Sequence, residues 1–92
     1  MASGNELIEI FAGISDFEEM KAFIEEILTP KEIEDFYLRW KLLQELNAGY
    51  TQRSIAAKYG ISLCKITRGS KILKKDNSIT KKILDKYQRG TK

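Results

Sequence analysis

Apolar residues recur every three or four positions along almost the whole 92-residue chain, and this spacing is typical of amphipathic α-helices. Val is absent, there is one Pro, and no segment alternates apolar with polar residues for long, so strand signals are weak. The pattern predicts an all-α fold of six helices. A chain of this length is long enough for one domain and too short for two.

Cap residues mark where the expected helices begin. Thr29, Pro30 and Glu32 form a strong helix start, because Thr caps well, Pro suits the first helical position and Glu completes a capping box. Ser15, followed by Glu18, predicts a second capping box upstream. We expect a single domain over 1–92, with N-terminal dimerisation helices in 1–28, a long core helix over 30–48, a helix-turn-helix over 51–70 and a C-terminal helix over 78–88.

The composition excludes several classes of protein. The chain has no His and one Cys, which rules out a zinc site, a His-based catalytic triad and an internal disulfide. Apolar runs reach three residues, whereas a membrane span needs about 20. A Gly-rich phosphate loop is also missing. We therefore expect a cytoplasmic protein that is not an enzyme, binds no metal and does not enter a membrane.

The net charge of +3 conceals an uneven distribution of charge. Residues 1–36 carry ten acids and two bases, a net charge of −8, whereas residues 37–92 carry fourteen bases and three acids, a net charge of +11. Such asymmetry favours a polyanion as the partner of the second part. The alternative is that acidic and basic helices face each other or remain solvated.

The expected helix over 30–48 is apolar on nearly all sides, and such a helix is normally buried on all sides. A short monomer has few neighbours to cover it, so we expect a homodimer, with a monomer that exposes some leucines as the alternative. Trp40 is expected to belong to the core. Arg39 falls within the apolar arc and needs a partner there, either a ligand or a structural ion pair to Glu32, to Asp35 or to a neighbouring subunit.

Residues 52–68 have the pattern of a helix-turn-helix. Ala56 is small enough for two short helices to cross closely, and Gly60 suits the left-handed turn between them. Ser62 is expected to cap the second helix. The side chains expected to face inward are Ile55, Tyr59, Ile61 and Ile66.

In this motif the first turns of the second helix enter the major groove of DNA. Lys65 could donate to guanine or bind phosphate, and the surrounding bases could neutralise further phosphates. The alternative is a helical hairpin without a DNA role. The residues expected to contact DNA are Arg53, Ser62, Leu63, Cys64, Lys65 and Thr67.

Three parts of the sequence carry a resemblance to a known family: Leu28-Thr29-Pro30, then Gly49 with Thr51-Gln52-Arg53, and finally Ile66-Thr67-Arg68-Gly69-Ser70. Together they resemble the bacterial Trp repressor over residues 28–74. The resemblance implies an intertwined all-helical homodimer that binds operator DNA when L-tryptophan is bound. Such a dimer would repress genes of tryptophan biosynthesis or transport.

The resemblance also implies a site for L-tryptophan as corepressor. Arg39 and Arg68 would enclose the indole ring, and Thr29 would lie beside the ligand. Gly69 would let the ligand approach the backbone. Backbone carbonyls near Glu26 and Leu28 of the other subunit would accept from the ligand's amino group.

The sequence departs from this family at three places. Ile72 stands where the family's ligand pocket has a Ser, and the loop between Gly49 and Thr51 is one residue shorter than usual. Leu63, Cys64 and Lys65 replace the family's small residues on the recognition face. These departures motivate a second hypothesis, a related DNA-binding regulator that needs no tryptophan or uses another effector. A third hypothesis is a dimeric module that binds an acidic protein instead of DNA.

Overall fold

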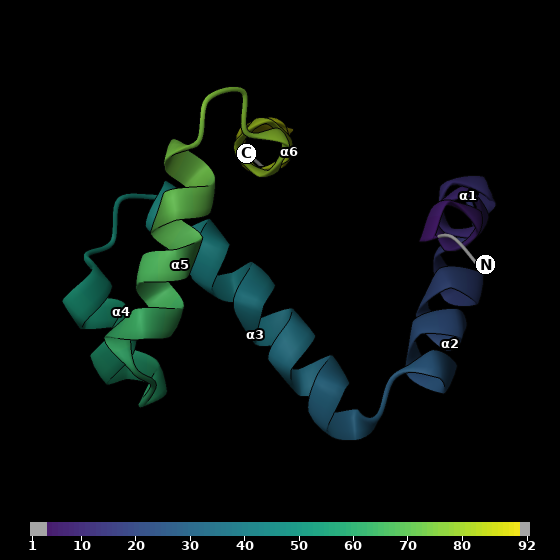
Figure 1. Ribbon diagram of the computed structural model, residues 1–92, viewed down its shortest axis with the longest axis horizontal. Coiled ribbons are helices and arrows are strands. Elements are labelled where there is room, and N and C mark those ends of the chain that lie inside the picture. Colours follow the sequence, from purple (N-terminus) through teal and green to yellow (C-terminus); the bar gives the residue numbers. More distant parts are fainter. Residues whose placement is uncertain (1–3, 91–92) are drawn as a thin grey trace. The chain divides into compact units, whose positions relative to one another are not determined.

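The computed structural model describes residues 4–90, and within them the chain forms six α-helices and no strand. The helices are α1 (Gly4–Gly13), α2 (Phe17–Ile27), α3 (Pro30–Asn47), α4 (Gln52–Tyr59), α5 (Leu63–Lys74) and α6 (Ile79–Gly90) (Figure 1). The all-α prediction is confirmed. The chain divides into two compact units, residues 1–35 and 36–92. Among the described residues, no helix has the length and apolar character required to cross a membrane.

The first unit contains α1, α2 and the first turns of α3, and no residue of α1 or α2 is buried. Phe11 of α1 and Phe23 of α2 pack together with their ring centroids 5.3 Å apart. Most of the other large apolar side chains remain open to solvent. The exposed ones are Leu7, Ile8, Ile10, Phe17 and Ile27. Each of these two helices therefore keeps an apolar surface that its own unit does not cover.

Capping side chains fix where α2 and α3 begin. The Thr29 hydroxyl accepts from the N–H of Glu32 at 3.1 Å, and the Glu32 carboxylate accepts from the N–H of Thr29 at 2.8 Å. This pair confirms the predicted capping box of α3. At α2 the cap is Asp16, which accepts from the N–H of Glu19 at 2.8 Å, so the prediction that placed the cap at Ser15 is wrong by one residue. Ser and Asp cap about equally well, and the two stand side by side in the sequence.

The core of the second unit lies where α3, α4 and α5 meet. Figure 1 shows α4 and α5, in green, beside the C-terminal end of α3. Leu42 of α3 packs with Ile55 of α4 and Ile66 of α5, and both isoleucines are fully buried. Side chains that pack around this centre are Leu38, Leu46, Ala56, Tyr59 and Ile61. The inward-facing set predicted for the helix-turn-helix is thereby confirmed.

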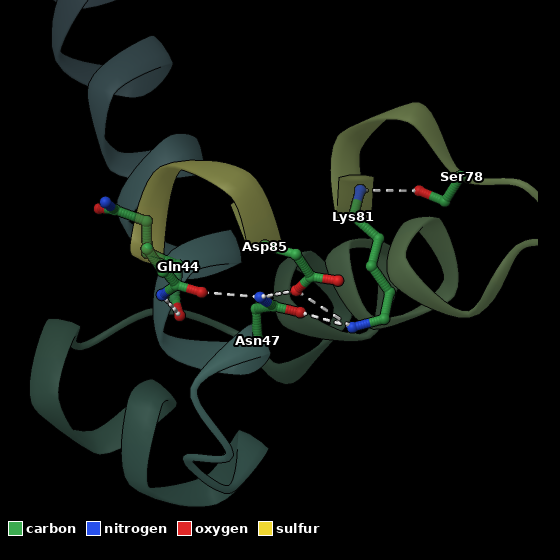
Figure 2. Close-up of polar contacts among 6 residues, drawn as sticks. Gln44, Asn47, Ser78, Lys81 and Asp85 are labelled. Carbon is green, nitrogen blue, oxygen red and sulfur yellow. Dashed lines mark hydrogen bonds and ion pairs between the residues drawn. The ribbon is translucent and has the colours of Figure 1, made fainter. Parts of the chain in front are cut away.

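Polar groups join α6 to the end of α3, and we name the residues that carry them the α6 clasp: Gln44, Asn47, Lys81, Asp85 and Gln88. Asn47 lies at its centre, as Figure 2 shows. Its amide nitrogen donates to Asp85 at 2.9 Å and to Gln88 at 2.7 Å, and its amide oxygen accepts from Lys81 at 3.0 Å. Gln88 also donates to the carbonyl of Gln44 at 3.2 Å. The clasp therefore holds α6 at the C-terminal end of α3.

Helix α6 has one buried side and one exposed side. Leu84 is fully buried, and the buried Ser78 hydroxyl accepts from the N–H of Lys81 at 3.1 Å at the start of the helix (Figure 2). Ile79, Ile83 and Tyr87, spaced four residues apart, are all more than half exposed. An apolar stripe thus runs along the exposed side of α6.

Aromatic side chains also stay exposed on the part of α3 that belongs to the second unit. Phe36 is 52% exposed, Tyr37 is 50% exposed and Trp40 is 37% exposed. Trp40 contacts the Tyr87 ring edge-on, with a centroid distance of 6.4 Å. The described helices of this unit leave that side of α3 open, so the predictions that Trp40 lies in a core and that α3 is buried on all sides depend on the homodimer and stay predictions.

Candidate nucleic-acid interface

The helix-turn-helix consists of α4, a tight turn and α5. Gly60 has φ +64°, a left-handed conformation that costs most other residues energy. The carbonyl of Ala56 accepts from the N–H of Gly60 at 2.8 Å and from the N–H of Ile61 at 3.2 Å, which closes α4. Thr51 caps the start of α4 by accepting from the N–H of Ser54 at 3.1 Å. The turn expected from the sequence is therefore present.

The outer side of α5 begins with exposed side chains. Leu63, Cys64 and Lys65 occupy its first turn and all are exposed. Ser62 stands at the capping position, but its hydroxyl makes no capping bond to the described backbone of α5. The position of this cap was thus predicted correctly, whereas its hydrogen bond was not. Arg53 is exposed on the first turn of α4.

Thr67 differs from the other residues expected to contact DNA because its hydroxyl already has a partner in the described part of the chain. It donates to the side-chain oxygen of Gln52 at 3.0 Å, and both residues are half-buried. This bond ties the first residue of α4 to the second turn of α5. Gln52 belongs to the segment that carries the family resemblance, but the sequence does not predict its bond to Thr67, because the two residues lie 15 positions apart.

A groove of about 610 Å³ runs along the outer side of α5. Its lining is part apolar and part cationic. The residues that line it are Leu63, Cys64, Thr67, Arg68, Lys71, Ile72 and Lys75. Between Gln52 and Lys75 the chain has seven Lys or Arg residues and no Asp or Glu. The groove therefore lies in an acid-free, positively charged segment that favours a polyanion as ligand.

The residues expected to bind tryptophan lie in different environments. Arg68 lines the groove on α5, whereas its neighbour Gly69 is buried. A Cβ on Gly69 would lie 3.2 Å from the Leu46 side chain and 3.4 Å from that of Leu43. The space beside this glycine is thus used for close packing of α5 against α3.

Arg39 and Thr29 complete the set expected from the resemblance. Arg39 is exposed on α3 in the single chain and is not among the residues that line the groove, so its enclosure by a ligand or a partner stays a prediction. Of the acids considered as its partners, Asp35 pairs with Lys31 at 3.1 Å and Glu32 caps α3. Thr29 is engaged in that same cap, in the first unit.

A buried carboxylate, which the sequence reasoning missed, connects α3 with α4. Glu45 is 8% exposed, and its Oε2 accepts from the Tyr59 hydroxyl at 2.5 Å and from the Lys58 ammonium at 2.9 Å. The bond from Tyr59, together with Lys58, holds the pKa of Glu45 below its usual range, although burial opposes this shift. The same bond raises the pKa of Tyr59. Among the described residues, Oε1 of Glu45 is buried and has no hydrogen-bond partner.

Within the described residues, no three His, Cys, Asp or Glu side chains are grouped so as to hold a metal ion. The polar features of the second unit are thus of two kinds. Side chains such as Glu45 and Asn47 join helices to one another. The cationic side chains on the outer side of α5 surround an open groove instead.

Comparison with known proteins agrees with this arrangement. The profile of the family described as "Trp repressor protein" matches residues 3–88. A "Trp operon repressor homolog" of Xylella fastidiosa is 40% identical over 72 residues, which cover 77% of this chain and 78% of that protein. A protein of the same name from Chlamydia caviae is 40% identical over 70 residues, covering 75% and 69% of the two chains.

No solved structure matches the chain significantly. The family profile, by contrast, extends from the start of α1 almost to the end of α6 and includes the helix-turn-helix and its groove. The chain therefore belongs to the Trp repressor family, a family of transcription regulators.

Proposed function

We propose that the chain is a DNA-binding transcriptional repressor that binds operator DNA as a homodimer when L-tryptophan is bound. It would control genes of tryptophan biosynthesis or transport in the cytoplasm. The observation that carries this proposal is the exposed, acid-free outer side of α5 in a helix-turn-helix. Such a side matches the position and the charge of elements that enter the major groove.

DNA contact is assigned to both helices of the motif. Lys65 on α5 and Arg53 on α4 are exposed cations suited to phosphate or base contacts. Leu63 and Cys64, which are exposed on the first turn of α5, would face the bases. Two further residues complete the assignment, Ser62 at the cap and Thr67 in the second turn.

The homodimer is supported by apolar surfaces in both units. Phe36, Tyr37 and Trp40 are exposed on α3, and neither α1 nor α2 has a buried residue. Exposed apolar surface of this extent usually marks a contact between proteins. In the dimer the whole chain would act as one domain, with helices of one subunit covering those of the other.

L-tryptophan is proposed as corepressor on the basis of family membership. Arg39, Arg68, Thr29 and Gly69 are the residues assigned to it. The ligand would bind the DNA-competent arrangement of α5 more tightly than other arrangements and so increase its population. The free energy that couples such sites is typically about 1–3 kcal/mol.

A retardation assay tests the proposal. Duplex DNA from upstream of tryptophan genes is titrated with the full chain, with and without L-tryptophan. We expect tryptophan to tighten binding about 5- to 150-fold, the range that corresponds to this coupling free energy. Arg39→Ala should remove the response to tryptophan while the dimer persists. Lys41→Ala, which removes a nearby exposed cation on α3, should keep the response.

A second candidate function is a DNA-binding regulator that is independent of tryptophan or uses another effector. It is favoured by the packing of Leu43 and Leu46 against Gly69, and by Ile72 in the lining of the groove. DNA binding that tryptophan leaves unchanged would support this candidate over the first. Failure to bind any DNA at low salt would leave the dimeric module for an acidic protein as the remaining hypothesis.

A further inference from the structure

Leu63 is an unusual residue for a surface as cationic as the outer side of α5. It is the first residue of that helix and is 47% exposed. With Cys64 it forms the N-terminal, uncharged end of the groove, whereas Arg68, Lys71 and Lys75 contribute positive charge further along the helix. The groove thus offers an apolar contact at one end and charge along the rest.

The charge in this region suits DNA, the occupant that the proposed function requires. Seven bases and no acids lie between Gln52 and Lys75, so the segment is complementary to a phosphate backbone. In a helix-turn-helix the N-terminal residues of the second helix contact base edges. Leu63 is therefore placed toward the bases, and the cations in the later turns toward phosphates.

A leucine cannot donate or accept a hydrogen bond, so it cannot distinguish bases through their polar groups. In the major groove the apolar group that differs between bases is the C5-methyl of thymine. We propose that Leu63, flanked by Cys64, recognises a thymine methyl group and makes the chain select thymine at the positions it contacts. This inference rests on the proposed function, because it requires that α5 enters the major groove.

The test begins with selection of bound sequences from a random duplex pool, using the full chain with and without L-tryptophan. Each thymine of the selected duplex is then replaced in turn by deoxyuridine, which removes the methyl group alone. At one or two positions we expect binding to weaken about fourfold, the effect of losing one buried methyl group. Leu63→Ala should bind the thymine and uracil duplexes equally.

Two further variants serve as controls. Leu63→Met keeps an apolar side chain of similar volume and should retain the preference for thymine. Lys75 lines the same groove, but Lys75→Ala should weaken binding to the thymine and the uracil duplex equally, because phosphate contacts carry no sequence information. Leu63 is exposed, so these comparisons do not depend on a change in the core.

Each other outcome has a distinct meaning. Selected DNA without a preferred thymine, or without any loss on uracil substitution, would overturn the inference and leave DNA binding intact. A thymine preference that persists in Leu63→Ala would assign the contact to another residue and overturn the inference too. If no sequence is enriched and no DNA is bound, the proposed function fails, and the inference fails with it.

Discussion

A buried carboxylate needs hydrogen-bond donors, and Glu45 obtains two of them from α4. Tyr59 and Lys58 both donate to its Oε2, so a single oxygen carries the polar connection between α3 and the first helix of the helix-turn-helix. Charge-assisted bonds of this kind are stronger than neutral ones. Glu45 therefore contributes to the position of α4 as well as to the stability of the unit.

We expect Glu45→Gln to lower the free energy of unfolding by about 1–3 kcal/mol at neutral pH, because two donors lose a charged acceptor. The pKa of Glu45 is lowered in the folded chain, so its carboxylate stabilises the fold fully above the ordinary glutamate pKa of about 4.3. That stabilisation is lost as the pH falls through the lowered folded value. Urea unfolding measured from pH 7 to pH 3 should show that the free energy of unfolding declines less in Glu45→Gln than in the wild type.

Glu25→Gln is a suitable control because Glu25 is exposed on α2. Its stability should follow the wild-type curve closely over the same range of pH. If Glu45→Gln also followed the wild-type curve, the carboxylate would not hold α4.

Whether the role of a residue could be predicted from the sequence depends on how far along the chain its partners lie. Burial of Ile55 and Ile66 could be predicted because it follows from helical spacing within one motif. The role of Glu45 could not, because its partners lie 13 and 14 residues later and only the folded chain brings them together. Arg39 is exposed in the single chain, so the apolar surroundings that helical spacing predicts for it would require a dimer or a ligand.

At the scale of elements, the turn between α4 and α5 depends on a single backbone conformation. Gly60 has φ +64°, and beyond its two chain neighbours a Cβ on this residue would meet no heavy atom within 4 Å. Gly60→Ala should therefore cost about 1–2 kcal/mol of unfolding free energy through backbone strain alone. Thermal or urea unfolding of the variant measures this cost.

Gly13→Ala provides the matched control. Gly13 is the last residue of α1, a Cβ there also meets open space, and its φ is not in the left-handed region. Alanine at this position should be neutral or slightly stabilising. Equal effects of the two substitutions would contradict the argument from the turn.

Helix boundaries could be predicted from the sequence to within a few residues because caps and glycines act locally. The helix-turn-helix expected over 51–70 begins at the Thr51 cap of α4, and the cap of α2 lies one residue after the predicted Ser15. The α6 clasp could not be predicted, since its bonds join Gln44 and Asn47 to side chains 34 to 44 residues away. Such pairs follow from the fold and leave no periodic signal.

For the whole molecule, charge and apolar surface both bear on the proposed homodimer. Residues 1–36 have a net charge of −8 and residues 37–92 a net charge of +11, so acidic segments of one copy can approach basic segments of another. We expect light scattering to give twice the chain mass of 10.6 kDa at micromolar concentration. Phe36→Asp should lower that mass or abolish helical structure, because it places a charge on an exposed apolar side of α3.

Tyr50→Ser is the comparison for this variant. Tyr50 is also an exposed aromatic residue, 55% exposed, but it lies between α3 and α4 and outside the apolar side of α3. Tyr50→Ser should leave the mass of the assembly unchanged. A stable, helical wild-type monomer at these concentrations would contradict the homodimer.

The α6 clasp also fixes where α6 stands along α3. Asn47 bonds Lys81, Asp85 and Gln88, which follow one another at intervals of four and three residues on one side of α6. A slide of α6 by one residue would rotate these groups by about 100°, and hydrogen bonds do not tolerate such a change. Apolar packing alone would permit neighbouring registers. The exposed stripe of α6 is thus held at one axial position, so a partner would meet a single arrangement of its side chains.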